Sequence, residues 1–307
     1  MNRWAPSTNN KYQRGWTRWE EWCRLHPESP ARPAIAFYIG LYFNDLVIEG
    51  CKFGTLTEAS AAIRWGHLGF GFDNPMDNQF VNIVLEGAKR EVGMPPSAQK
   101  EPMSPEMVKE VVQLFGQGTN LLHHRTVVIC LLGFSGFLRI SELLDIQIKH
   151  LTFLSSHLEI LIPKAKNDQL RQGHIVHIKR LNSQFCPVQW LQAYLDRSGL
   201  ITGENNYIIS RLAKSRSGHR AYGYKPLAES TVRDIFNKDI APLCDDTQPG
   251  DYSLHSMRSG GASAAINHGV SERLIGKHGR WKSGFCRDRY LKDGKKQRLE
   301  ITQNIGL

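Results

Sequence analysis

The sequence lacks any apolar run of the roughly 20 residues that a helix needs to cross a bilayer. Its most apolar stretch, from Ala34 to Ile48, is interrupted by Asn44 and Asp45. The residues from Met1 to Pro6 contain no apolar segment of the kind that directs secretion. We therefore expect a protein that is neither embedded in a membrane nor secreted.

Closely spaced cysteines are also missing. The six cysteines are far apart and form no C-x-x-C pair. This spacing argues against a cysteine zinc site and a disulfide scaffold, and it fits a reducing compartment. Cys23 and Cys130 lie in apolar patterns, which predicts that they are core residues.

Acidic residues are in deficit. Lys and Arg number 39 against 29 Asp and Glu, a net charge of +10. Residues 1–93 hold ten of each sign, so the rest of the chain carries the whole excess. A basic domain favours DNA, RNA or an anionic membrane as partner, although charge alone fits a soluble basic surface equally well.

The first 93 residues show helical periodicity and no strand pattern, which predicts a small helical bundle. Trp16, Trp19 and Cys23 fall on one face of the first helix, with Tyr12. The fourth helix is expected to pass through Phe80, Ile83, Val84 and Gly87. The expected helices run from Ser7 or Thr8 to about Leu25, from Pro33 to about Ile48, from a capping box at Thr55–Glu58, and from the cap Asn78 to Arg90.

A proline-rich linker over residues 94–103 separates this bundle from a second domain, residues 104–307. Ser104 is positioned to cap the first helix of that domain, with Pro105 in its first turn. Residues 158–163 and 174–178 predict two strands of a hairpin, and residues 211–226 read as a basic loop. The remaining segments predict helices, so the fold class is α+β, with a mainly helical second domain and a small antiparallel sheet.

Four segments of the second domain carry residues suited to phosphate chemistry. Each alone has an ordinary explanation, such as a surface ion pair, a solvated hairpin lysine or a half-buried ring. The segments are Gly136-Phe-Leu-Arg139-Ile-Ser-Glu142-Leu143, Lys164-Ala-Lys166-Asn-Asp168, His255-Ser-Met-Arg258, and Gly279-Arg-Trp281-Lys282 followed by Tyr290.

Their order and spacing make the chain resemble the tyrosine recombinase (phage-integrase) family. Arg139 with Ser141-Glu142-Leu143 is similar to the first box of that family, and His255-x-x-Arg258 to the second. Trp281 follows Arg258 by 23 residues and precedes Tyr290 by nine. His177 and Arg180 form another H-x-x-R pair without this continuation, and we assign them to a strand. The segment Gly279-Arg-Trp-Lys-Ser283 resembles recombinases of eukaryotic mobile elements (DIRS-like or Crypton).

The resemblance implies a site-specific recombinase that cuts and rejoins DNA through a covalent 3′-phosphotyrosine and a Holliday junction. Tyr290 would be the nucleophile. Arg139 and Arg258 offer planar donors for the nonbridging phosphate oxygens, and a neutral His255 can accept the phenol proton. Lys166, with Lys164 as the alternative, would protonate the leaving oxygen.

Trp281 offers an indole N–H and an apolar wall, although a core tryptophan is the simpler explanation. Glu142 is expected to fix the orientation of Arg139 without contacting the substrate. The alternative is that Glu142 is an ordinary acidic residue on the surface of a helix. The chain lacks a phosphate-binding G-x-x-x-x-G-K-[ST] loop and an obvious carboxylate cluster, so we expect no cofactor and no metal.

The resemblance also implies that residues 1–93 are a SAM-like core-binding domain and that double-stranded DNA is the partner. A homotetramer is expected on DNA, with a monomer or dimer in its absence. A eukaryotic element would place the protein in the nucleus, and a bacterial one in the cytoplasm or nucleoid. The expected DNA contacts are Lys11, Arg14, Arg18, Arg64, Lys89, Arg90, Lys164 and Arg216. Two alternatives stay open, a type IB topoisomerase and a recombinase-derived DNA-binding protein without catalysis.

Overall fold

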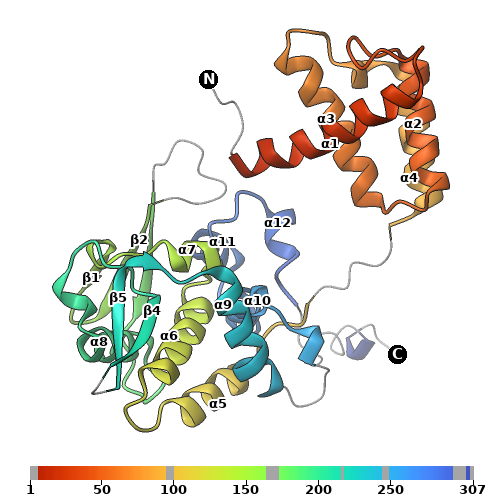
Figure 1. Ribbon diagram of the computed structural model, residues 1–307. Coiled ribbons are helices and arrows are strands. Elements are labelled where there is room, and N and C mark those ends of the chain that lie inside the picture. Colours follow the sequence, from red (N-terminus) through yellow and green to blue (C-terminus); the bar gives the residue numbers. More distant parts are fainter. Residues whose placement is uncertain are drawn as a thin grey trace. The chain divides into compact units, whose positions relative to one another are not determined.

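The computed structural model of the protein describes residues 6–94, 100–163, 173–215, 218–243, 249–292 and 302–304. The chain forms two compact units, Met1–Ala98 and Gln99–Leu307 (Figure 1). Within the described ranges, no helix is both long and apolar enough to traverse a bilayer. Lys164, Lys166 and Arg216 lie outside the described residues.

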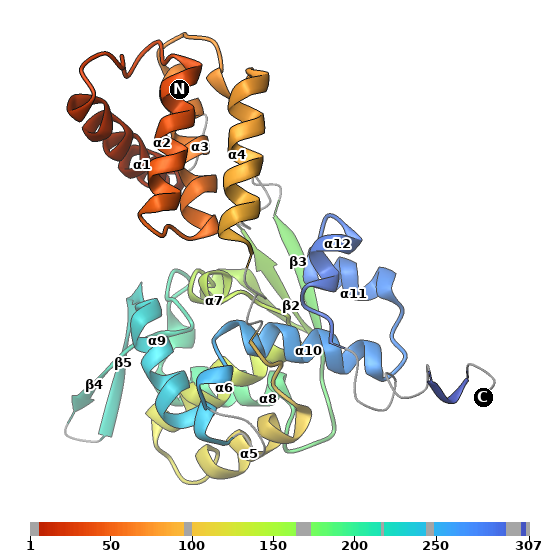
Figure 2. The ribbon, with the colours of Figure 1, turned by 90° about the vertical axis from the view of Figure 1, so that its right-hand side faces the viewer.

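The first unit is built from helices that pack in pairs, α1 against α3 and α2 against α4 (Figure 2). Trp16 and Trp19 of α1 are buried with Phe43 of α2 and Leu56 of α3. This confirms the predicted buried face of the first helix. The helices are α1 (Pro6–Leu25), α2 (Ala36–Ile48), α3 (Phe53–Gly69) and α4 (Gln79–Val92), with the 3-10 turn η1 (Pro75–Asp77) before α4.

Three predicted helix starts in the first unit can be compared with the structure. The start of α4 is confirmed, and the predicted starts of α2 and α3 are wrong. The Asn78 side chain caps α4 by accepting from the N–H groups of Phe80 and Val81, as predicted. Pro33 does not open α2, which begins at Ala36 after an extended residue. Thr55 lies inside the first turn of α3 rather than before it. Pro33 and Thr55 therefore lie near the first residues of α2 and α3 but do not determine where these helices begin.

Only part of the apolar stripe of α4 faces the core. Phe80 and Ile83 are 45% and 64% exposed, whereas Val81, Leu85 and Ala88 are buried against the core. The pattern of α4 allows two neighbouring apolar stripes, and packing against α2 selects one of them.

The second unit is a mainly helical body around α6, which packs against α5, α8 and α10. One antiparallel sheet has the order β1-β2-β3, and β4 and β5 form a separate ribbon. The elements are α5 (Pro105–Phe115), α6 (Leu121–Ser135), α7 (Ile140–Leu144), β1 (Leu151–Phe153), β2 (His157–Ile162), β3 (His174–Lys179), α8 (Pro187–Ser198), β4 (Ser210–Ser215), β5 (Gly218–Pro226), α9 (Glu229–Ile235), α10 (His255–Asn267), α11 (Glu272–Gly279) and α12 (Gly284–Asp288).

Most predicted elements of this unit are confirmed. Ser104 caps α5 by accepting from the Met107 N–H, and the two predicted strands are β2 and β3. His177 lies in β3, as assigned. The short strand β1 was not predicted.

The basic loop predicted over residues 211–226 is wrong, because these residues belong to the β4–β5 ribbon. Leu212 and Ala221 face each other across the ribbon and pack against the core. The basic side chains of Arg211 and Arg220 are exposed. A two-stranded ribbon needs only a few inward apolar residues, so its strand pattern is weak in the sequence.

The backbone of helix α10 lies very close to the backbone of two neighbouring segments. A β-carbon at Gly260 would lie 2.3 Å from the Met103 carbonyl oxygen, and one at Gly261 would lie 2.0 Å from that of Phe134. Only glycine fits at such distances. The two glycines therefore fix α10, and with it Arg258, against the loop before α5 and the end of α6.

Candidate active site

The predicted site residues come from three separate parts of the second unit. Arg139 precedes the first residue of α7, and His255 and Arg258 occupy the first turn of α10. Trp281 follows α11, and Tyr290 follows α12. Tertiary packing, rather than local sequence, must bring these segments together.

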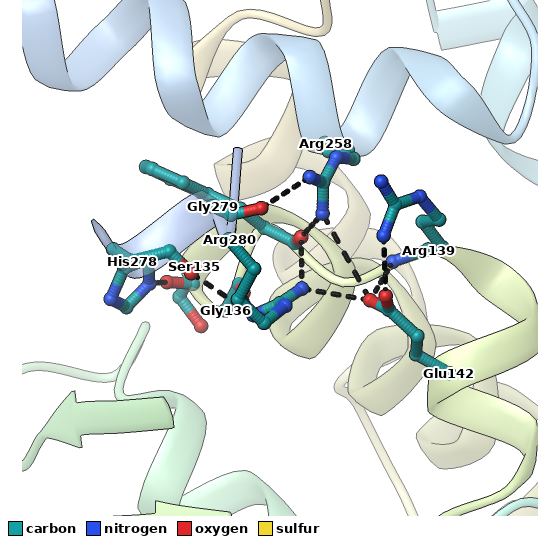
Figure 3. Close-up of polar contacts among 9 residues, drawn as sticks. Ser135, Gly136, Arg139, Glu142, Arg258, His278, Gly279 and Arg280 are labelled. Carbon is teal, nitrogen blue, oxygen red and sulfur yellow. Dashed lines mark hydrogen bonds and ion pairs between the residues drawn. The ribbon is translucent and has the colours of Figure 1, made fainter. Parts of the chain in front are cut away.

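Glu142 of α7 lies at the centre of the arrangement, and its side chain is only 2% exposed (Figure 3). Its Oε1 accepts from Nη1 of Arg139 at 2.6 Å, and its Oε2 accepts from the Arg139 backbone N–H at 2.9 Å. Oε2 also accepts from Nη2 of Arg280 at 2.7 Å and lies 3.9 Å from Nη1 of Arg258. Three guanidiniums thus surround one carboxylate, which leaves a net positive charge suited to an anion.

Arg258 is completely buried. Its Nη1 donates to the carbonyl oxygen of Phe137 and its Nη2 to that of Gly279 (Figure 3). Its guanidinium carbon lies 4.5 Å from the centroid of the Trp281 ring and 5.3 Å from that of Tyr290. The centroids of these two rings are 5.3 Å apart. Arg258, Trp281 and Tyr290 therefore form one contact cluster.

Arg280 is a component of this site that the sequence did not single out. Its side chain is 6% exposed and bridges Glu142 to the loop after α6, donating to the Phe137 carbonyl at 2.9 Å. Arg280 and Phe137 both adopt a positive φ, at 59° and 45°. Such conformations cost about 1–3 kcal/mol each and persist where the surroundings impose them. The only available signal was the position of Arg280 beside Trp281.

His278 supports the same loop from the other side. Its Nε2 donates to the Ser135 carbonyl at 2.9 Å, and its ring lies edge-on to Phe137 with centroids 4.6 Å apart. Burial lowers the pKa of His278, as does the charge of Arg280, although the Ser135 hydrogen bond opposes them. A neutral ring suits this position beside the arginine cluster.

The charges around Glu142 determine its ionisation. Burial by itself raises the pKa of this carboxyl. The charge of Arg280, the backbone N–H of Arg139 and the guanidiniums of Arg139 and Arg258 outweigh burial, so the pKa lies below its ordinary value. Burial and the neighbouring guanidiniums of Arg139 and Arg280 lower the pKa of Arg258. An arginine nevertheless stays cationic at neutral pH.

The segment that holds Tyr290 is attached to α10. Oγ of Ser263 donates to the Tyr290 carbonyl at 3.2 Å and accepts from the Lys292 N–H at 2.9 Å. Nζ of Lys292 then donates to Glu101 at 2.7 Å. These contacts hold the tyrosine segment on the helix that also carries Arg258.

Trp281 has an unused donor. Its Nε1 is buried and has no hydrogen-bond partner among the described residues. A buried N–H of this kind is costly unless a ligand satisfies it. The indole is therefore available to an anion placed beside Arg258.

The remaining predicted residues within the described ranges lie at the start of α10 and in the first unit. His255 is exposed at the start of α10, one turn before Arg258. In the first unit, Lys11 pairs with Glu58 at 3.1 Å and Lys89 pairs with Glu86 at 2.8 Å. The arginines Arg14, Arg18, Arg64 and Arg90 are exposed.

Comparisons with known proteins agree with this geometry. The sequence model of the phage integrase family matches residues 103–297. An integrase/recombinase XerD homolog of Selenomonas ruminantium is 28% identical over an alignment of 296 residues, with 94% of this chain and 82% of that protein covered.

Solved structures share the fold. The Tn1549 transposon integrase in complex with transposon right-end DNA has a TM-score of 0.58 at 12% identity, with 98% of this chain and 95% of that chain covered. A lambda integrase dimer bound to a COC′ core site also has a TM-score of 0.58, at 14% identity, with 96% and 92% covered.

Proposed function

This chain belongs to the phage integrase family, and on that premise we propose the residues with which it acts. The chain is a tyrosine recombinase, an enzyme that breaks and rejoins DNA by transesterification through a phosphotyrosine. The observation that supports the assignment is that Arg139 and Arg258 meet at Glu142, while the rings of Trp281 and Tyr290 lie against Arg258.

The Tyr290 oxygen attacks the phosphorus of the scissile phosphodiester. A bond from this oxygen to phosphorus forms, and the bond from phosphorus to the 5′ oxygen breaks. The products are a 3′-phosphotyrosyl link and a free 5′ hydroxyl. The reverse attack by a 5′ hydroxyl rejoins a strand and releases the tyrosine. The phosphoester bond is conserved throughout, so joining needs no nucleotide.

The cations of the site stabilise the negative charge that develops on the nonbridging oxygens. Arg139 and Arg258 provide guanidiniums, and Trp281 provides its unpaired indole N–H. Glu142 and Arg280 act as positioning residues, because they hold Arg139 and the Phe137 carbonyl rather than the substrate.

Two proton transfers accompany the step. His255 takes the proton from the Tyr290 hydroxyl, and Lys166 delivers one to the leaving 5′ oxygen. Lys164 is the alternative to Lys166. These roles follow from the family resemblance and from general acid–base chemistry.

DNA is the substrate, and we place it in contact with both units. Residues 1–93 act as a core-binding domain through Lys11, Arg14, Arg18, Arg64, Lys89 and Arg90, and Arg216 of the second unit adds a phosphate contact. Exchange of two pairs of strands implies four protomers on DNA. Measurement of the solution mass with and without site DNA tests this expectation.

A nicked suicide substrate tests the assignment. The nick lies next to the scissile phosphate, so that the released 5′-hydroxyl fragment diffuses away and the adduct accumulates. The substrates are duplexes taken from the repeats that flank the source gene. The parent protein should form a complex that survives denaturation, with the DNA linked to Tyr290 in peptide mapping.

Two variants serve as controls. Tyr290→Phe should bind DNA but form no adduct, whereas Tyr224→Phe, at an exposed tyrosine of β5, should form it normally. An adduct with Tyr290→Phe would refute the nucleophile assignment. Relaxation of a supercoiled plasmid without junction formation would favour a topoisomerase, and DNA binding without any adduct would favour a protein that has lost catalysis.

A further inference from the structure

Two histidines and a glutamate lie together on one face of the β1-β2-β3 sheet. His157 and Glu159 are two residues apart on β2, so their side chains point to the same face. Glu159 is paired directly with His177 of β3. Because β2 is hydrogen-bonded on both sides, the backbone fixes the spacing of all three side chains.

The three side chains place their ligand atoms close together. Nε2 of His177 lies 3.3 Å from Oε1 of Glu159, and Nε2 of His157 lies 3.5 Å from the same oxygen. All three ligand atoms lie within 4.8 Å of one another. Ligands bonded to zinc at about 2.0–2.1 Å in a tetrahedron are themselves about 3.3 Å apart.

A neighbouring residue orients one of the histidines. Oγ of Ser156 is hydrogen-bonded to Nδ1 of His157 at 2.8 Å, which directs Nε2 of that ring toward Glu159. Histidine ligands of metals usually have such a partner on the nitrogen that does not bind the ion. The side chains are 29%, 30% and 59% exposed for His157, Glu159 and His177, so an ion and a water ligand can enter from solvent.

We propose that His157, Glu159 and His177 bind one Zn²⁺ ion, with water at the fourth position. Imidazole nitrogen suits zinc and its neighbours in the transition series, whereas Mg²⁺ prefers a shell of oxygen ligands. The bound ion joins β2 to β3. In the sequence, these strands precede and follow residues 164–172, which include Lys166. The binding itself does not depend on the proposed recombinase chemistry.

Zinc titration of the full chain, without a histidine tag, tests the proposal. Cys286 is an exposed thiol and is replaced by serine in every protein used. Calorimetry should show one equivalent of zinc, and an excess of Mg²⁺ should not displace it. The Co²⁺ derivative should show the visible bands of a tetrahedral site, without the charge-transfer absorption of a thiolate ligand.

The variants His157→Ala, Glu159→Gln and His177→Ala should each lower the affinity at least about tenfold, since loss of an outer-shell partner alone has that effect. The matched control is His268→Ala, at an exposed histidine of α10's C-cap, which should leave the affinity unchanged. Zinc should also raise the melting temperature of the parent and of the control, and not of the three variants.

The proposal fails if the parent takes up no zinc. It also fails if the three variants bind zinc as tightly as the parent while their circular dichroism shows a folded chain. A thiolate charge-transfer band in the Co²⁺ derivative would assign the metal to a cysteine and likewise overturn the site.

Discussion

Nη2 of Arg280 donates to Oε2 of Glu142 at 2.7 Å, which joins two residues 138 positions apart in the chain. Both side chains are almost completely buried, and Arg280 also donates to the Phe137 carbonyl. The pair thus connects the end of α11 to the start of α7, where Arg139 lies.

Arg280→Ala should destabilise the second unit by about 1.5–3 kcal/mol, because it removes a charge-assisted hydrogen bond to the buried Glu142 carboxylate. Urea or thermal unfolding of the full chain measures the loss. The matched control is Arg233→Ala, which breaks an exposed pair with Glu229 and should change stability by about 0.5 kcal/mol or less. Equal effects of the two substitutions would show that the Arg280 contact contributes little.

Glu142 should make stability depend on acid pH. Its pKa is lower in the folded chain than the ordinary value of 4.5, so its contribution is present above that value. As pH falls from about 4.5 through the folded-state pKa, the unfolded chain takes up the proton first and the contribution is lost. Glu142→Gln should be less stable than the parent at neutral pH, and the difference should shrink at acid pH. A difference that stays constant between about pH 7 and pH 4 would contradict this expectation.

Trp281→Phe should slow adduct formation about 100-fold, the usual effect of removing one donor to the developing charge. The phenyl ring keeps an apolar wall next to Arg258 but has no N–H. Trp281→His restores a donor and should recover part of the rate. Thermal unfolding separates the two roles of Trp281. If phenylalanine retained the full rate, the indole N–H would have only a structural role.

Arg14→Ser combined with Arg18→Ser should weaken DNA binding in a salt-dependent way. Each lost phosphate contact lowers the slope of log affinity against log salt by about one, so the double variant should lose about two. Arg24→Ser is the control, because Arg24 lies on a different face of α1. Titration at several salt concentrations measures the slope. An unchanged slope would remove these two arginines from the DNA interface.

Elements with strong local signals were predictable from the sequence. Ser104 and Asn78 each accept backbone N–H groups of the following helix, a short-range interaction that the residue type itself favours. The alternation in β2 and β3 reflects one buried face. The boundary of α2 and the inner face of α4 were not predictable in this way, because packing between helices decides them.

The candidate site also contains residues that were predictable from the sequence and residues that were not. Arg139, Arg258, Trp281 and Tyr290 were recognised by their spacing. In the structure Arg258 contacts Trp281 and Tyr290, and Glu142 connects Arg258 to Arg139. Arg280 was missed because a single arginine has no periodicity, and its partner Glu142 is remote in sequence. His157, Glu159 and His177 were missed as a group for a similar reason, since only the register of β2 and β3 brings them together.

The burial of Arg258 has a consequence for the fidelity of cutting. Its guanidinium is covered by the rings of Trp281 and Tyr290 and tied to the carbonyls of Phe137 and Gly279. We therefore expect a phosphate to contact Arg258 only after the Trp281 and Tyr290 rings shift, at a cost in free energy that DNA binding has to supply. A duplex that binds weakly should then be cut more slowly than one that binds tightly.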